Sequence, residues 1–352
     1  MSHNTIIPCT KTIMKNARLF FSYLLPLVLL LILSAAALLV GSISLSPAEV
    51  WQSLIGGGNS GNEVADFIVL DTRLPRLLTA LFSGAALAVA GLLMQNIFAN
   101  PLADPSILGV NTGAGLGVAI AMLWMGGSAA AGGLHLSGYA LVCTAAFLGA
   151  TAVIFLLLFC SAFLRGRLPL LIAGVMISFL ASSAIAILNF YATAQGVRSF
   201  MIWGLGDFGG VGTQQLPAYI GILCLGLFCA WLMAKSLNVL QLGTDYATNL
   251  GVRVRAVRIA TLLLTGLLTA IVTAFCGPIS FIGLAVPHAA RLTLRTADHR
   301  HLIPVSILWG ATIALLCNVV AHLPESGNVL PLNALTPLIG APIVLLILFR
   351  RK

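Results

Sequence analysis

Apolar runs long enough to cross a lipid bilayer recur along almost the whole chain, and no other feature constrains its fold as strongly. A transmembrane helix needs roughly 20 mostly apolar residues. Hydrophobic residues make up 59% of the 352 residues and charged residues only 8%, whereas a soluble domain has about 25% charged residues. The sequence therefore predicts an all-α, polytopic membrane protein and excludes a soluble enzyme, a disordered chain or a soluble domain with one anchor.

The apolar runs predict about ten transmembrane helices. They lie at residues 19–40, 76–97, 107–125, 138–160, 168–191, 216–234, 258–276, 279–295, 303–322 and 332–349. Residues 1–18 are expected to form a cytoplasmic N-terminal tail, and residues 19–352 a single transmembrane domain. The second to fifth and seventh to tenth spans form two four-helix blocks. Each block opens with a helix rich in Gly, Ala or Thr and a proline-broken turn, which makes the blocks candidate inverted repeats.

The basic residues predict the orientation. If the spans alternate from a cytoplasmic N-terminus, only Arg73, Arg76 and Arg198 face outward, and the other 15 of the 18 Lys and Arg residues face inward. This is the positive-inside pattern. It predicts a multi-pass protein of the cell (inner) membrane with both termini in the cytoplasm. The formal net charge of +9 then belongs to cytoplasmic loops beside the lipid bilayer, so no nucleic-acid partner is expected.

Charge placement and motifs also limit the function. No Asp or Glu is predicted near the centre of a span, which argues against an ion-coupled carrier. The sequence has no Walker-type GxxxxGK[ST], no HExxH and no GxSxG, so we expect neither enzyme activity nor a cofactor in this chain. Its seven cysteines show no metal-type pairing, and no metal site is predicted. A transporter with neither coupling charges in its spans nor an ATP-binding motif is expected to draw energy from a separate protein.

Two segments flank the second predicted span. Arg73-Leu-Pro-Arg76 opens it on the outer side. The two arginines could anchor lipid headgroups or pair with Asp71, or they could dock an acidic surface of an external partner. Small residues such as Gly84 and Gly91 within the span favour close helix packing. The span is followed by NPLADP at residues 100–105, whose two prolines forbid a continuous helix. That turn is either a plain tight turn or a gate at the membrane edge.

The longest predicted cytoplasmic connection, residues 235–258, mixes apolar and charged residues. Gly243 and Gly251 bracket a stretch long enough for a short helix, which Thr244 could cap and Gly251 could end. Leu242, Ala247 and Leu250 have no evident partner inside the membrane. They predict either a loop resting on lipid or a docking platform for a cytoplasmic protein.

Two further segments have local signals. GPISFIGLAVPHAAR at residues 277–291 contains a Gly-Pro break and His288, which we interpret as a structural histidine rather than a ligand. Residues 196–204 after the fifth span are amphipathic and too short to cross, so a short interfacial or re-entrant helix is expected.

Several long motifs together resemble one family. They are RLPR at 73–76, AGLLMQ ending at Gln95, NPLADP at 100–105, LGTDYATNLGV at 242–252, GPISFIGLAVPHAAR at 277–291 and TPLIGAP at 336–342. Their order and sequence resemble the FecCD-type permease subunits of ABC importers for iron–siderophore, haem and vitamin B12, over nearly the whole chain after the first helix.

The resemblance implies a ten-helix permease that works with a second copy of itself and supplies no ATPase. Two cytoplasmic ABC ATPase subunits would dock on Leu242, Gly243, Asp245, Ala247, Leu250 and Gly251. An external substrate-binding protein would dock its acidic residues on Arg73 and Arg76, and Asn100 and Leu102 would belong to the cytoplasmic gate. The alternative from another class is a stand-alone facilitator or channel that needs no ATPase.

The sequence departs from the family pattern in two places. The family has Glu-Leu-Pro-x-Gly before the last helix, where this chain has Val329-Leu-Pro-Leu-Asn333. Residues 165–168 are Arg-Gly-Arg-Leu, where vitamin B12 permeases have small polar residues. The chelate, whether siderophore, haem or cobalamin, is left open by these residues, and no pair of haem ligands is evident.

Overall fold

Backbone N–H and C=O groups find no water partners in the interior of a bilayer, so apolar spans must satisfy them within helices. In the computed structural model every predicted apolar run contains a helix. The structure describes residues 7–41, 43–58, 61–126, 128–131, 134–164, 166, 168–323 and 329–350. Arg165, Arg167, Glu325 and the ends of the chain lie outside these residues.

Helices make up most of the described chain, with one pair of short strands between the third and fourth predicted spans. The elements are α1 (Ile7–Leu39), α2 (Pro47–Gly56), α3 (Glu63–Asp66), η1 (Phe67–Arg73), α4 (Leu74–Ile97), η2 (Pro105–Leu108), α5 (Val110–Ala119), η3 (Ile120–Trp124), β1 (Ser128–Ala131), β2 (Leu134–Ser137), α6 (Gly138–Phe163), α7 (Leu168–Tyr191), α8 (Ala194–Gly204), η4 (Phe208–Gly210), α9 (Leu216–Leu232), α10 (Ala234–Leu240), α11 (Thr244–Asn249), α12 (Val254–Cys276), α13 (Ile282–Leu294), α14 (His299–Ala321) and α15 (Leu332–Arg350).

The predicted helical membrane fold is confirmed, but the number of spans is not. By length and composition, six helices of the described chain could cross a membrane, or seven if α9 and α10, bent by 49° at their junction, form one span. The helices at Val110–Trp124 and Leu332–Leu345 are shorter apolar helices, and α13 has 13 residues. Ten crossings therefore stay a prediction, as does the inverted repeat.

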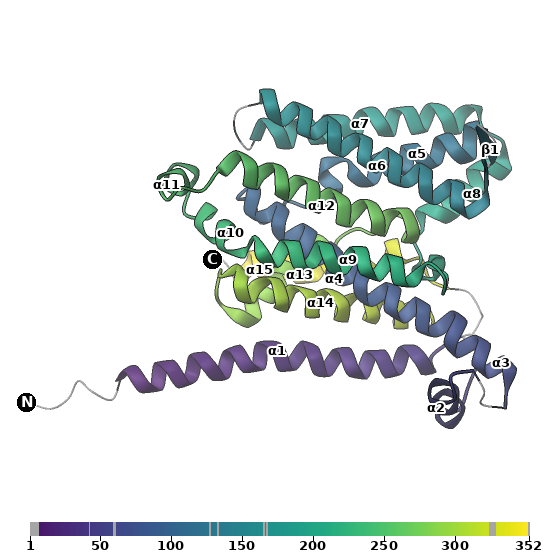
Figure 1. Cartoon of the computed structure of the whole chain (residues 1–352), viewed down its shortest axis with the longest axis horizontal. Helices are drawn as coiled ribbons and strands as arrows, with labels where there is room; N and C mark the ends of the chain where they lie inside the picture. The colour runs from purple at the N-terminus through teal and green to yellow at the C-terminus, as the bar shows by residue number, and fades with distance from the viewer. Residues whose placement is uncertain are drawn as a thin grey trace, which may run out of the picture.

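The first and last helices of the chain begin and end on the same side of the bundle, as an even number of crossings requires. The beginning of α1, the end of α15 and α11 lie at one end of the molecule, on the left in Figure 1, and α2, α3 and β1 lie at the other end. Below, these ends are called the α11 end and the α2 end.

Several elements differ from the prediction. Helix α1 begins at Ile7 and so extends into the segment predicted as a tail. Helix α10 was not predicted as a separate helix, because residues from Lys235 onward mix apolar and charged side chains and were assigned to the cytoplasmic connection. The antiparallel pair β1 and β2, in which Ser128 pairs with Ser137, adds a small hairpin to an otherwise helical fold. A short helix is confirmed near residues 196–204 as α8, with Thr193 as its N-cap; its interfacial or re-entrant placement stays a prediction.

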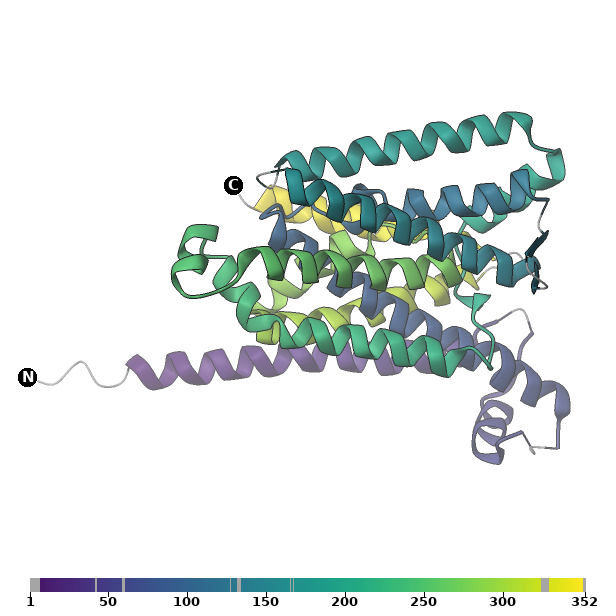
Figure 2. The ribbon, with the colours of Figure 1, turned by 45° about the horizontal axis from the view of Figure 1, so that its top comes forward.

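Helix α4 is the centre of the bundle. Every residue from 83 to 97 is buried, whereas α1 and α7 lie on opposite sides of the molecule in both views (Figures 1 and 2). Glycines bring α4 into backbone contact with its neighbours. A Cβ atom at Gly84 would lie 2.2 Å from the carbonyl oxygen of Gly310 in α14, and one at Gly91 would lie 1.9 Å from that of Gly283 in α13. Close packing is thus confirmed as the reason for the small residues.

Replacement of Gly91 by alanine is expected to destabilise the fold, because its methyl group would meet backbone that cannot rotate away. Overpacking costs roughly 1–3 kcal/mol, and we expect a lower thermal midpoint and less monodisperse protein in detergent. Gly221→Ala on α9 is the matched control, since no atom would lie within 4 Å of a Cβ at that position. Equal thermal midpoints for the two variants would contradict this account of the packing.

Candidate functional site

Arg73 fastens the end of α1 to the bundle. Only 6% of its surface is exposed. Its Nη1 donates to the carbonyl oxygens of Leu38 at 2.6 Å and Leu39 at 3.0 Å, and its Nη2 donates to the carbonyl of Ile43. The last carbonyls of a helix lack intrahelical partners and have partial negative charge. Arg73 therefore caps α1. Its predicted contact with an external partner stays a prediction.

Arg76 pairs with His322, a residue that the sequence analysis did not single out. Nη1 of Arg76 lies 2.7 Å from Nε2 of His322, and Nδ1 of His322 lies 2.8 Å from the carbonyl oxygen of Asn318. Arginine nitrogens only donate, so Nε2 must accept and Nδ1 must hold the proton. His322 is therefore neutral in this contact. The available signal was its position at the end of the ninth predicted span, on the same side of the membrane as Arg76.

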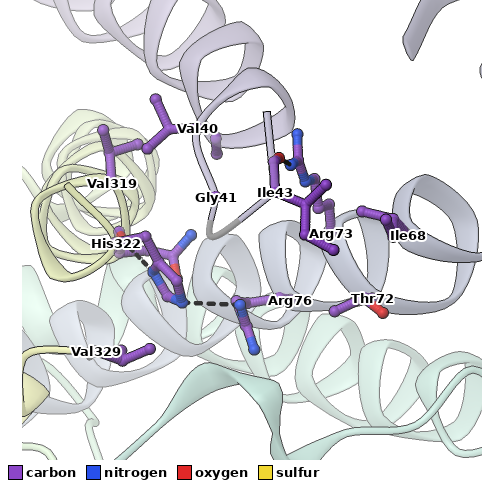
Figure 3. Close-up of a pocket in the computed structure, with 12 residues that line it drawn as sticks. Val40, Gly41, Ile43, Ile68, Thr72, Arg73, Arg76, Val319, His322 and Val329 are labelled. Carbon is purple, nitrogen blue, oxygen red and sulfur yellow. Dashed lines mark hydrogen bonds between the residues drawn. The ribbon is translucent and has the colours of Figure 1, made fainter. Parts of the chain in front are cut away.

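Arg73, Arg76 and His322 line a cavity of about 280 Å³ at the α2 end of the bundle, between the end of α1, the start of α4 and the end of α14 (Figure 3). None of the described residues that line it is acidic. Nε of Arg76 is buried without a hydrogen-bond partner among the described residues. Asp207 lies close to this guanidinium: a Cβ at Gly209 would be 2.6 Å from Oδ2 of Asp207 and 3.0 Å from Nη2 of Arg76. The charge of Arg76 is therefore partly balanced within the chain, and Nε is left as a donor that an additional acceptor could use.

The turn after α4 is irregular but ordered. Ala99 has a left-handed φ of 46°, and the Asn100 side-chain oxygen accepts from the backbone N–H of Leu102 at 2.9 Å. Leu102 is 43% exposed. Asp104 is buried and caps η2 by accepting from the N–H of Ser106. Burial raises the pKa of the Asp104 carboxyl, although the hydrogen bonds from Ser106 oppose the rise. The role of Asn100 and Leu102 in a gate stays a prediction.

The predicted coupling segment, residues 235–258, contains two short helices joined by a sharp turn. Helix α11 begins at Thr244 with Gly243 as its N-cap, so the prediction that Thr244 is the cap was wrong. The positive φ of 113° at Gly243 explains why the turn there requires glycine. The predicted end at Gly251 is confirmed: its N–H donates to Thr248, and that of Val252 donates to Ala247, which is a Schellman motif.

This segment presents apolar side chains outward. Ala247 is fully buried, whereas Leu242, Tyr246 and Leu250 are 65%, 55% and 56% exposed. Asp245 is exposed in the first turn of α11. The structure thus brings the six predicted coupling residues together in one short, anchored projection at the α11 end. Arg73 and Arg76 lie near the opposite end of the bundle, at the start of α4.

The remaining candidates have structural contacts. Nδ1 of His288 lies 2.8 Å from the carbonyl oxygen of Leu284 one turn earlier. Asn333, where the family pattern has glycine, donates from its side chain to the carbonyl of Gly204 at 2.9 Å and so ties α15 to α8. Within the described residues, no group of three His, Cys, Asp or Glu side chains could hold a metal ion.

A bundle of apolar helices with ordered polar segments at its two ends defines the class of multi-pass membrane proteins. The model of the FecCD transport family matches residues 28–350. The chain therefore belongs to the FecCD transport family.

Relatives and a solved structure agree with this assignment. The chain is 35% identical over 338 residues to the hemin transport system permease protein HmuU of Yersinia pestis, covering 95% of this chain and 96% of that protein. It is 36% identical over 313 residues to the vitamin B12 import system permease protein BtuC of Klebsiella pneumoniae, covering 88% and 90%.

The solved structure is an inward-facing ABC transporter assigned to the metal-chelate type. It matches with a TM-score of 0.79 at 30% identity and covers 94% of this chain and 98% of that chain.

The contact between Arg76 and His322 predicts a pH dependence. Burial lowers the pKa of His322 from its ordinary 6.5, and Arg76 lowers it further, against an upward effect of the Asn318 carbonyl. The unfolded chain then binds more protons in this pH range, so stability is present above about pH 6.5 and decreases as the pH falls. Between pH 7.5 and 5.5 the thermal midpoint should drop by roughly 1–3 °C more for the wild type than for His322→Gln. Equal drops in a thermal-shift assay would contradict this assignment.

Proposed function

We propose that this chain is the transmembrane permease of an ATP-driven ABC importer that moves a metal chelate into the cytoplasm. It works as a homodimer with two cytoplasmic ABC ATPase subunits and an external substrate-binding protein. The cargo class is an iron–siderophore, haem or cobalamin. The names of the relatives support it, since they describe hemin transport, vitamin B12 import and a metal-chelate transporter.

The coupling segment is the observation on which the proposal depends most. A short helix held by glycine turns projects from the bundle and exposes Leu242, Tyr246 and Leu250. Such a side-chain group would cost free energy in water, and it suits a cleft on a second protein. Because this chain has no ATP-binding motif, we assign that cleft to an ATPase subunit.

The orientation follows from the same assignment. The coupling segment would face the cytoplasm, and the cavity beside Arg76 would face outward. Both chain termini then lie in the cytoplasm, and the protein is a multi-pass protein of the cell inner membrane. The excess of Lys and Arg in the connections at the α11 end of the molecule supports this orientation.

Docking of the external protein is assigned mainly to Arg76. The described residues that line the cavity include no acidic one, although Asp207 lies close to Arg76. A carboxylate from a partner would supply an acceptor for the unpaired Nε of Arg76. Arg73 would add its positive charge to that of Arg76, while its Nη1 stays hydrogen-bonded to the last carbonyls of α1.

Gentle-detergent purification from the native membrane, followed by mass spectrometry, tests the proposal. Co-purification of an ATPase with a Walker motif, and ATP-dependent uptake after reconstitution with it, are the expected results. Uptake by the reconstituted chain alone, with no ATPase recovered, would favour the facilitator over the importer.

Disruption of the coupling segment should separate ATP hydrolysis from transport. We expect Leu250→Asp to weaken ATPase association about tenfold or more, because a charge would enter an apolar contact. The thermal midpoint should stay unchanged, since Leu250 is 56% exposed. Asn249→Asp, at an exposed neighbouring position, is the matched control, because it adds the same charge without removing an apolar side chain. Unchanged association in a pull-down of Leu250→Asp would refute the docking role.

Charge reversal at Arg76 should weaken docking of the external binding protein. We expect Arg76→Glu to reduce affinity about tenfold at low salt, with a smaller effect at high salt because screening grows. Arg198→Glu, also on the predicted outer side, is the matched control and should have little effect. Surface plasmon resonance at two salt concentrations measures both. Equal affinities for wild type and Arg76→Glu at low salt would remove this role.

A further inference from the structure

A partly buried polar cluster joins the coupling segment to the last turn of α4. It contains Asn96 of α4, Asn238 of α10, and Asp298 and His299 at the start of α14. His299 has no exposed surface and Asn96 has 7%. Gln241, directly after α10, adds a donor to the carbonyl of Ala297 at 3.2 Å. Helices from three distant parts of the chain therefore meet at one hydrogen-bonded joint.

The donors and acceptors fix the direction of the hydrogen bonds that join Asn96, Asn238 and His299. Nε2 of Gln241 also lies 3.1 Å from Nδ1 of His299, but in this assignment both atoms are donors and form no hydrogen bond with each other. Nδ2 of Asn96 donates to the carbonyl of Leu237 at 3.2 Å and lies 3.1 Å from Nε2 of His299. Since a carbonyl only accepts, this atom must be the amide nitrogen, and Nε2 of His299 accepts from it. Nδ1 of His299 then holds the proton and donates to Oδ1 of Asn238 at 2.8 Å.

The chain of hydrogen bonds continues into the cap of α14. Nδ2 of Asn238 donates to Oδ1 of Asp298 at 2.6 Å, and Oδ1 of Asn238 also accepts from the backbone N–H of His299 at 2.8 Å. Asp298 accepts from the N–H of Arg300 and so caps α14. Hydrogen bonds aligned in this way in a partly buried site strengthen one another, so they tie α10 to the start of α14.

The same turn of α4 leads directly into the predicted gate. The N–H of Asn100 donates to the carbonyl of Gln95 at 3.2 Å, and that of Ala99 to the carbonyl of Asn96 at 3.1 Å. Nη1 of Arg291 in α13 donates to Oε1 of Gln95 at 2.5 Å. Residues 95 and 96 are thus bonded on one side to other helices and on the other side to the turn that contains Asn100 and Leu102.

Stability alone does not account for this arrangement. Oδ1 of Asn96 is buried without a hydrogen-bond partner among the described residues. Leaving a buried acceptor unsatisfied costs about 1–3 kcal/mol, whereas an apolar side chain of similar shape there would have no such cost. The presence of Asn96 is therefore better explained by its amide nitrogen, which links α4 to Leu237 of α10 and His299 of α14.

We propose that Asn96, Asn238 and His299 are positioning residues that make the gate turn follow movements of the coupling segment. The inference rests on the proposed docking of ATPase subunits on that segment. If α10 moves when an ATPase closes, it must either break the buried bonds to Asn96 and His299 or move the end of α4 with it. Breaking them would leave several polar groups unsatisfied, so movement together is favoured.

The test measures the gate turn while the ATPase subunits are bound. Leu102→Cys is introduced into the full complex, and its rate of maleimide labelling is measured with and without ATP, with the native cysteines subtracted as background. The joint is then broken by Asn96→Leu, which keeps the volume and removes the amide. Asn111→Leu is the matched control, because Asn111 bonds Thr273 and belongs to α5, outside the cluster.

We expect ATP to change the labelling rate in the Leu102→Cys complex and in the Asn111→Leu control. In Asn96→Leu the ATP-dependent change should be lost and transport per ATP hydrolysed should fall about tenfold, while the ATPase subunits remain bound. Asn238→Leu should give the same loss, and the double variant should add no more, because both residues act in one joint.

The outcomes separate the two proposals. An ATP response in Asn96→Leu and Asn238→Leu equal to that of the control overturns the joint and leaves the importer intact. Absence of any ATP response in the complex without these substitutions overturns the proposed coupling, and the joint with it. If Asn96→Leu does not fold, Asn238→Leu decides the result from the α10 side.

Discussion

The backbone contact of α4 with α13 and α14 is the constraint on which the rest of the structure depends. Lipid tails are as apolar as leucine, so helices in a bilayer gain little from hiding apolar surface and must gain from close packing. Gly84 and Gly91 allow that packing because a Cβ at either position would overlap a facing carbonyl oxygen. A helix held this closely cannot bend easily in its middle, so both of its ends are placed by the same contacts.

The two ends of α4 have different polar chemistry. At the α2 end, Arg73 donates to the last carbonyls of α1 and Arg76 donates to the neutral ring of His322. At the other end, Gln95 and Asn96 bond three other helices just before the irregular turn. Between the ends, Ser83 makes a further buried contact, 2.7 Å from the hydroxyl of Tyr219 in α9. Polar contacts thus hold α4 to its neighbours at both ends and near its middle.

Part of this site could be predicted from the sequence and part could not. The glycines at 243 and 251 marked a short helix because positive φ is a local property of single residues, and the structure confirmed the end at Gly251. The cap at Thr244 was wrong because Gly243 already supplies the turn. Arg73 was expected to anchor lipid headgroups, to pair with Asp71 or to dock an external partner. Its hydrogen-bond partners instead lie 30 to 35 residues earlier in the chain, and no local pattern indicates such a pairing.

The sequence by itself determined the membrane class, the helical runs, the small residues of the central helix and the family, because apolar length, glycine and long motifs are written in consecutive residues. Only the tertiary structure decided that Arg73 is buried, that His322 must be neutral beside Arg76, and that Asn96, Asn238 and His299 meet. The members of these pairs lie far apart in the chain. Arg76 and His322 are 246 positions apart, Asn96 and His299 are 203 apart, and Asn238 and His299 are 61 apart. Contacts between such distant residues follow from helix packing and not from local propensity, so the protonation and partners of these side chains exist only once the helices have packed.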